Sequence, residues 1–207
     1  ACVASGSFDG TLKLWVETEP DRWQEWSAVR GRSPVQAMAG PPDGSWLIVG
    51  AADGSAEVWK VTSSGLESVT SLPGRRDGVT SLAVAPDGRR AILGSRDGSL
   101  RVWDPDTRER PGERILVEYG RGITSVAVTP DGLRAISGDS DGMLRVWDLS
   151  TGPEAGLRVI PGHGDWVLAV TAVGIDGEVA SGGGDGLVKL WNLPQGMGNS
   201  GDVSQVL

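Results

Sequence analysis

The sequence predicts an all-β fold built from repeated, four-stranded antiparallel sheets. Two observations lead to this prediction. The first is that five tryptophans recur at a constant spacing of 44 residues, at Trp15, Trp59, Trp103, Trp147 and Trp191. The second is that each tryptophan ends a seven-residue phrase that begins with Asp-Gly, as in DGTLKLW and DGSLRVW. A period of roughly 20 to 50 residues is typical of units that bury their apolar faces on their neighbours.

The two best-defined strands of each unit flank the Asp-Gly pair. The segment before the tryptophan alternates aliphatic and charged residues, as in Leu100-Arg101-Val102, which is the period expected for a strand. A second apolar run, such as Ala91-Ile92, lies upstream of the pair. Asp-Gly is a strong hairpin signal because glycine adopts positive φ without strain. We therefore expect a hairpin in all five units.

Two further strands complete the unit. One begins 24 residues before the tryptophan in four units, at Val35, Val79, Ile123 and Val167. Another precedes it in the chain, as in residues 157–160. Large apolar groups point to both sides of the tryptophan strand, so both faces need cover, which favours sheets stacked face to face. A β-propeller of four-stranded blades meets this requirement, with the first of five blades lacking its first strand.

Composition and charge restrict the classes of function. The chain has 207 residues and a formal net charge of −8, which opposes binding along a phosphate backbone, so we expect no nucleic acid partner. No stretch approaches the ~20 consecutive apolar residues of a membrane-spanning helix, so we expect no membrane partner. Cys2 is the single cysteine, which rules out an internal disulfide. This agrees with a reducing compartment, and we predict a cytoplasmic location.

The units resemble WD repeats, the Trp-Asp family of β-propellers. Trp103-Asp104 and Trp147-Asp148 carry the dipeptide that names the family. Three units depart from it, at Val16, Lys60 and Asn192. The resemblance covers essentially the whole chain, and it identifies residues 1–207 as one propeller domain or a large part of one. It implies a non-catalytic protein-interaction scaffold without cofactors, of the kind used in signalling.

The resemblance also implies a buried, hydrogen-bonded tetrad in the best-formed blades. The family places a His before the first strand, a Ser on the second, an Asp in the following turn, and the Trp on the third. The last unit holds a complete set, namely His163, Ser181, Asp185 and Trp191. A hydrolase triad is the alternative interpretation, but the serine lacks a G-x-S-x-G nucleophile elbow. We therefore expect a structural network and no catalytic residues.

The repeated Asp-Gly pairs could suggest a calcium site. The stretch Asp139-Ser140-Asp141-Gly142 imitates the start of an EF-hand loop, but its Gly follows the second Asp directly and no later Glu follows. The glycine-rich residues 181–186 lack the lysine of a phosphate-binding loop and lead into a strand. We expect turns and no metal site. A propeller enzyme or a metal site in the channel is a less favoured alternative.

Loops that are equivalent in position but differ in side chain are candidates for partner recognition, because loops on a rigid frame carry function. In WD-repeat propellers, the position before the turn Asp and the loop entering the first strand lie on one rim of the channel. We predict a mixed aromatic and charged surface for a protein or peptide partner there. Its members are Phe8, Arg76, Arg96, Arg121, Asp165 and Trp166. Ordinary solvated loop residues, with Trp166 covering a strand edge, are the alternative.

Two predictions concern the outer edge and the ends of the array. Trp23 and Trp26 lie in the fourth-strand region of the first unit, and we expect them to pack against a neighbouring blade; a lateral binding surface is the alternative. WD-repeat rings most often have about seven blades, so we expect the units to belong to a longer chain. A five-bladed ring, or two chains completing one ring, would also be consistent. The alternative function is a structural array that self-assembles through open propeller ends.

Overall fold

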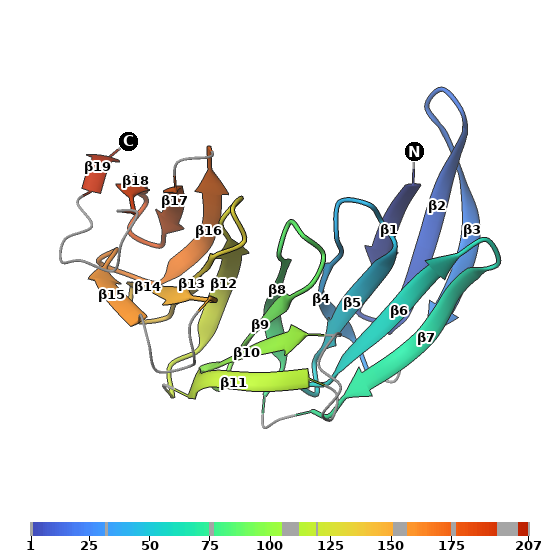
Figure 1. The fold of residues 1–207 in the computed structure, drawn as a ribbon, viewed down its shortest axis with the longest axis horizontal. Helices are drawn as coiled ribbons and strands as arrows, with labels where there is room; N and C mark the ends of the chain where they lie inside the picture. Colours follow the sequence, from blue (N-terminus) through green and yellow to red (C-terminus); the bar gives the residue numbers. More distant parts are fainter. Residues whose placement is uncertain are drawn as a thin grey trace.

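The computed structural model describes residues 2–31, 33–74, 77–104, 112–118, 120–150, 157–174, 177–193 and 203–206. The regular elements in these ranges are all β-strands, in five antiparallel sheets (Figure 1). The all-β prediction is therefore confirmed. Among these residues, no helix has the length and apolar character needed to cross a bilayer.

The strands of each sheet pair in the order in which they occur in the chain. Sheet 1 contains β1 (Cys2–Gly6), β2 (Thr11–Glu19) and β3 (Arg22–Arg30). Sheet 2 contains β4 (Val35–Ala39), β5 (Trp46–Ala51), β6 (Ala56–Thr62) and β7 (Gly65–Leu72). Sheet 3 contains β8 (Val79–Val84), β9 (Ala91–Ser95), β10 (Ser99–Asp104) and β11 (Gly112–Glu118). Sheet 4 contains β12 (Ile123–Val128), β13 (Arg134–Asp139), β14 (Met143–Asp148) and β15 (Leu157–Pro161). Sheet 5 contains β16 (Val167–Val173), β17 (Glu178–Gly183), β18 (Val188–Asn192) and β19 (Val203–Val206).

Each four-stranded sheet is one meander, but its outer strand is the strand that we predicted as part of the following unit, since residues 157–160 lie in β15, which pairs in sheet 4 and not in sheet 5. The predicted first strands are confirmed, since β4, β8, β12 and β16 begin at the predicted residues Val35, Val79, Ile123 and Val167. Sheet 1 starts at its second strand, as predicted, and has three strands. The hairpin glycines all have φ between 78° and 83°, a backbone conformation that favours glycine. They are Gly10, Gly54, Gly98, Gly142 and Gly186.

The sheets stack face to face around an arc. The first strands β4, β8, β12 and β16 lie on its inner side, and each contacts the next. Figure 1 shows sheet 1 and sheet 5 at the two ends of this arc, which does not close into a ring. Apolar clusters fill the junctions between sheets 2 and 3, 3 and 4, and 4 and 5. Both faces of a central sheet are covered, since residues 99–103 of β10 are all buried.

The outer strand of sheet 1 departs from the prediction. Trp23 and Trp26 on β3 are 42% and 39% exposed, so the expectation that they pack against a neighbouring sheet is wrong. β3 contacts sheet 2 through Ser27 instead, whose Oγ accepts a hydrogen bond from Leu66 N at 3.3 Å. A β-bulge places Trp26 between the pairs formed by Ser27 and Glu25 with β2, and this interrupts the alternation of the strand.

Candidate functional site

Two loops of each four-stranded sheet meet at one end of that sheet. The hairpin turn between the second and third strands is joined by a backbone hydrogen bond to the loop that leads into the first strand. The donor and acceptor pairs are Ala52 N with Pro34 O (2.9 Å), Arg96 N with Gly78 O (3.0 Å), Ser140 N with Gly122 O (3.0 Å), and Gly184 N with Trp166 O (2.8 Å). These bonds hold the variable loop positions at the same end of sheets 2 to 5. We call this end the rim.

The rim is continuous from sheet 3 to sheet 5 because the loops of neighbouring sheets touch. A methyl group added at Gly98, in the turn of sheet 3, would lie 2.6 Å from the carbonyl oxygen of Arg121, which enters sheet 4. A methyl group added at Gly142, in the turn of sheet 4, would lie 2.8 Å from the carbonyl oxygen of Asp165, which enters sheet 5. Each turn therefore needs a glycine to admit the loop of the next sheet.

The structure places four of the predicted partner-binding residues on this continuous stretch. They are Arg96, Arg121, Asp165 and Trp166, and all four are exposed. Arg121 Nε lies 3.0 Å from Asp141 Oδ2, so Asp141 joins the surface although sequence reasoning did not select it. Phe8 is 76% exposed but lies on sheet 1, two sheets away from Arg96. Arg76 lies outside the described residues.

Sheet 5 holds a chain of four hydrogen-bonded side chains next to the rim. His163 Nδ1 donates to Asp185 Oδ1 at 2.9 Å. Ser181 Oγ donates to His163 Nε2 at 2.7 Å, and it accepts a hydrogen bond from Trp191 Nε1 at 2.8 Å. Nδ1 carries the donor hydrogen because the Asp185 carboxylate only accepts, while the serine hydroxyl can both donate and accept. The His163 side chain is fully buried, so the network ties the loop entering sheet 5 to its second and third strands.

Hydrogen-bond donors surround the Asp185 carboxylate. The largest lowering of the Asp185 pKa comes from Gly164 N, which donates to Oδ2 at 3.0 Å. Leu187 N donates to Oδ1 at 3.2 Å. Together with His163 they lower the pKa of Asp185 to about 2, although partial burial acts in the opposite direction. Asp9 occupies the same turn position in sheet 1. Hydrogen bonds from the Thr11 side chain and backbone, and from Ser7, lower the pKa of Asp9 to about 2 as well.

Other sheets hold only parts of this network. In sheet 4, Trp147 Nε1 donates to Ser137 Oγ at 3.3 Å. In sheet 1, Trp15 Nε1 donates to Ser5 Oγ at 2.8 Å. Sheets 2 and 3 have Val49 and Leu93 at the serine position. Sheet 5 is therefore the sheet whose described residues combine all four members.

The stretch from Asp139 to Gly142 forms a hairpin turn. Asp139 Oδ1 accepts hydrogen bonds from the backbone N of Asp141 at 2.9 Å and of Met143 at 3.1 Å, and Oδ2 contacts Arg145. The carboxylates of this turn thus have partners within the protein. In the part of the chain that the structure describes, no three His, Cys, Asp or Glu side chains gather as a metal site would require.

A cation two residues before the tryptophan connects neighbouring sheets. Arg101 of sheet 3 is fully buried, and its Nη2 donates to Gly54 O in the turn of sheet 2 at 2.8 Å. Lys189 of sheet 5 donates to Gly162 O, in the loop that follows sheet 4, at 2.6 Å. Four of the five units carry Lys or Arg here, but Lys13 and Arg145 bind carboxylates of their own sheets, namely Glu25 and Asp139. The acceptors of Arg101 and Lys189 are backbone carbonyls in loops that follow or belong to the preceding sheet, and side-chain patterns do not reveal them.

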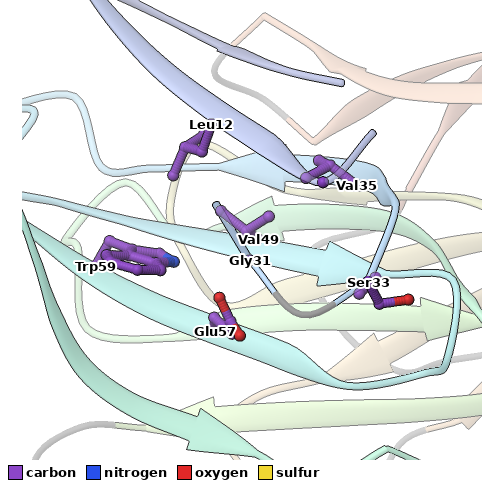
Figure 2. A pocket seen from close by; sticks show the side chains of 9 residues that line it. Leu12, Gly31, Ser33, Val35, Val49, Glu57 and Trp59 are labelled. Atoms are coloured by element: carbon purple, nitrogen blue, oxygen red, sulfur yellow. The ribbon is translucent and has the colours of Figure 1, made fainter. Parts of the chain in front are cut away.

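Sheet 2 has Glu57 at this position, beside a small pocket between sheets 1 and 2 (Figure 2). Glu57 is the one charged side chain among the lining residues, which include Leu12, Val49 and Trp59. The cavity volume of about 10 Å³ leaves room for roughly one water molecule. Gly10 also lines the pocket and corresponds to Gly54, whose carbonyl accepts the Arg101 hydrogen bond. Sheet 2 thus has the carboxylate of Glu57, a hydrogen-bond acceptor, at the position where sheet 3 has the hydrogen-bond donor Arg101.

The family model described as WD domain, G-beta repeat matches five segments, at residues 1–16, 26–60, 66–104, 113–148 and 156–192. No curated protein matches the chain. Each matched segment contains the Asp-Gly turn that precedes the tryptophan strand and ends one residue after the tryptophan.

Proposed function

This chain belongs to the WD-repeat family, and on that premise we propose that it is a non-catalytic scaffold whose rim binds a protein or peptide partner. WD repeats generally serve as protein-interaction scaffolds. The observation that carries the proposal is the continuous stretch of rim from Arg96 to Trp166. We also infer that the sheets are blades of a β-propeller. Cytoplasmic location, a role in signalling and the lack of a nucleic acid partner stay predictions.

Trp166 is the strongest candidate anchor on this stretch. It is 55% exposed, although burial of so large an apolar side chain would be favourable. Its carbonyl oxygen accepts the bond from Gly184 N, and its own N donates to Asp165 Oδ1 at 2.7 Å. A tryptophan on a backbone held in this way loses little conformational entropy on binding, which favours a hot spot.

Arg96 and Arg121 supply positive charge beside this aromatic anchor. A methyl group added at Gly122 would lie 3.1 Å from Arg96 O, so the two arginines stand on touching loops. The Arg121 and Asp141 side chains are 62% and 38% exposed, and exposed ion pairs of this kind contribute little to stability. Arg121 can therefore exchange Asp141 for a carboxylate of the partner. The chemistry suits a segment that carries a carboxylate close to an aromatic or aliphatic side chain.

The order Ser181, His163, Asp185 is also that of a hydrolase triad, and we infer a structural role for it. Ser181 is 2% exposed, and its Oγ already accepts the hydrogen bond of Trp191 Nε1. A substrate carbonyl would have to displace Trp191, which is 1% exposed, to reach this oxygen. A serine nucleophile needs an accessible Oγ with oxyanion donors beside it.

Peptide selection followed by calorimetry tests the proposal. Peptides selected from a displayed library against the wild-type chain are titrated into the wild type, R96A, W166A and V69A. Val69 is 59% exposed on the outer strand β7, so V69A controls for loss of an exposed apolar side chain. We expect affinities at least ~10-fold weaker for R96A and W166A, unchanged for V69A, with equal melting temperatures throughout.

Two results would contradict this proposal. Selected peptides whose affinity depends on neither Arg96 nor Trp166 would place the binding surface elsewhere. A large drop in the melting temperature of W166A would show that Trp166 acts in the packing of sheet 5 and not as a partner anchor.

A further inference from the structure

We propose that the junction between sheets 1 and 2 binds one alkali cation, Na⁺ or K⁺, between the Glu57 carboxylate and the backbone carbonyl groups of Gly10 and Gly31. The site is the pocket of Figure 2, and it does not depend on the partner surface of the rim. A cation here goes beyond the expectation of no metal site. Three features support it: the residues at the same place in other junctions, the atoms that face Glu57, and the size of the cavity.

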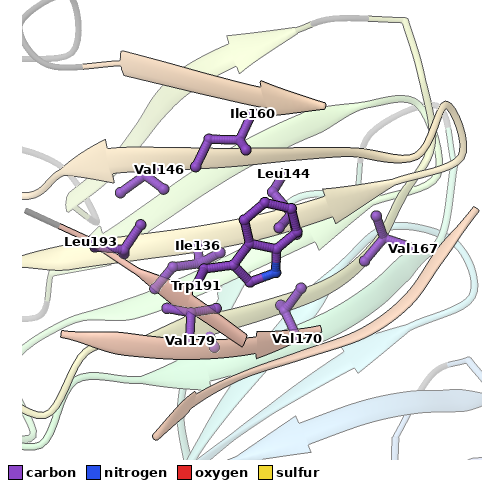
Figure 3. Packing of buried hydrophobic residues seen from close by; sticks show 10 residues of the cluster. Ile136, Leu144, Val146, Ile160, Val167, Val170, Val179, Trp191 and Leu193 are labelled. Carbon is purple, nitrogen blue, oxygen red and sulfur yellow. The ribbon is translucent and has the colours of Figure 1, made fainter. Parts of the chain in front are cut away.

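At two other junctions, the side chain two residues before the tryptophan brings a positive charge to a backbone carbonyl group. Arg101 Nη2 donates to Gly54 O at 2.8 Å. Lys189 Nζ donates to Gly162 O at 2.6 Å. Figure 3 shows the apolar cluster of this second junction around Trp191, which follows Lys189 by two residues. The same place in the repeat therefore holds a cationic group at both junctions.

At the junction between sheets 1 and 2, Glu57 occupies this place and faces the corresponding carbonyl groups. Gly31 N donates to Gly10 O at 2.9 Å, and the same backbone hydrogen bond joins Gly162 to the turn of sheet 4. Gly10 and Gly31 thus correspond to the two acceptors named above. A methyl group added at Gly31 would lie 3.2 Å from Glu57 Oε2 and 3.6 Å from Gly10 O. A carboxylate and a carbonyl oxygen, which both accept hydrogen bonds, therefore border one point in the pocket.

The charge of Glu57 is not balanced by a neighbour in the part of the chain that the structure describes. Glu57 is partly buried, and none of the described residues donates a hydrogen bond to its carboxylate or forms an ion pair with it. Removing a carboxylate from water is costly unless a counter-charge or hydrogen-bond donors replace the water. A cation at this point would balance the charge and would also bind the facing carbonyl oxygens.

The size and the ligands of the pocket select a small monovalent ion. The cavity volume of about 10 Å³ admits one ion or water molecule and excludes an organic cation. One carboxylate supplies a single negative charge, whereas Ca²⁺ takes six to eight oxygen ligands that include several carboxylates. Backbone carbonyl oxygens replace the hydration shell of K⁺ in channels. Because carbonyl groups supply most of the ligands, such a site needs no cluster of acidic side chains.

A tryptophan beside the pocket is a further favourable neighbour. Trp59 lines the cavity next to Glu57. The same two repeat positions in sheet 1 hold Trp15 and Lys13, and Lys13 Nζ lies 5.5 Å from the centroid of the Trp15 ring. The repeat therefore accommodates a cation close to this tryptophan, where the ring attracts positive charge.

Thermal melts in three chloride salts at one ionic strength test this inference. NaCl and KCl supply the two candidate ions, and tetramethylammonium chloride supplies a cation that is too large for the cavity. We expect the wild type to melt about 2–4 °C higher in the better alkali salt than in the organic salt, because a ligand that binds only the folded chain stabilises it. The alkali salt with the larger shift identifies the ion.

Two variants of Glu57 and one control assign the shift to this pocket. E57Q keeps the size of the side chain but removes its charge, so it should lose the difference between salts. E57R brings its own cation to the carbonyl groups, so it should melt at one temperature in all three salts. E178Q removes a carboxylate from an exposed position of β17 and should keep the full shift.

Three results would overturn the proposal. The first is a wild type that melts at one temperature in all three salts. Lower stability of R32Q would then identify Arg32, which follows Gly31 in the sequence and lies outside the described residues, as the positive charge beside Glu57. The second is a shift that persists in E57Q, since the ion would then bind elsewhere. The third is a shift in CaCl₂ alone, which would contradict a monovalent ion.

Discussion

The junction between sheets 4 and 5 and the junction between sheets 1 and 2 are built from the same repeat but are filled differently. At the first junction, Trp191 is 1% exposed in a cluster of buried apolar residues, and Lys189 donates to a carbonyl of the preceding loop. At the second, Trp59 is partly exposed and borders a pocket beside Glu57. The repeat thus sets the geometry of stacking, while a few side chains at each junction set how tightly the sheets pack.

Truncating the two tryptophans gives the largest expected effect. We expect W191A to lower the free energy of unfolding by about 3–5 kcal/mol, because it empties a buried aromatic site. W59A should cost clearly less, since Trp59 is partly exposed and already borders a cavity. Denaturant unfolding of both variants measures the difference. Equal losses would show that the two junctions are equally tight.

Serine-to-alanine variants compare how much the complete network of sheet 5 and the partial network of sheet 4 contribute to stability. S181A leaves both His163 Nε2 and Trp191 Nε1 without their hydrogen-bond partner, and we expect a loss of about 2–3 kcal/mol in the free energy of unfolding. S137A removes one longer hydrogen bond to Trp147, so about 1 kcal/mol is expected. Chemical denaturation again provides the measurement. A larger loss for S137A would contradict this ranking.

Converting Glu57 to arginine should tighten the looser junction. In sheet 3, Arg101 at the same position donates to Gly54 O, and Gly10 O is the corresponding carbonyl for residue 57. We expect E57R to raise the free energy of unfolding by about 0.5–1 kcal/mol. E178R makes the same charge change at an exposed position of β17 and should have no such effect. Destabilisation by E57R alone would mean that the pocket cannot accept a guanidinium group.

The acid dependence of stability gives the smallest effect. Asp9 and Asp185 both have a pKa of about 2 in the folded chain, below the ordinary value of 3.8. A lowered pKa stabilises the folded state above pH 3.8, and this contribution is lost as the pH falls from 3.8 towards 2. We therefore expect D9N and D185N each to flatten the fall in unfolding free energy over this range. Urea denaturation at a series of pH values measures this fall. If both variants lose stability between pH 3.8 and 2 as steeply as the wild type, the lowered pKa values of Asp9 and Asp185 are contradicted.

Trp23 and Trp26 show where prediction from the sequence stops. Their size favoured burial against a neighbouring sheet, yet both are exposed on an edge strand. The bulge at Trp26 arises from the register between β2 and β3, and Ser27 makes the contact with sheet 2. Register and neighbouring sheets are properties of the assembled fold, so the size of the side chain alone led to the wrong expectation.

The sequence by itself determined the strands, the five hairpins and the three-stranded sheet 1, because strand alternation and the turn preference of Asp-Gly are local properties of the backbone. It also located the variable rim positions through the constant spacing. The tertiary structure alone decided which rim loops touch, and so that Arg96, Arg121, Asp165 and Trp166 lie on one stretch, with Phe8 two sheets away from Arg96. It likewise decided that Arg101 binds a carbonyl 47 residues away. Such contacts join different repeats, and a local pattern carries no information about which distant backbone atom will lie beside a given side chain.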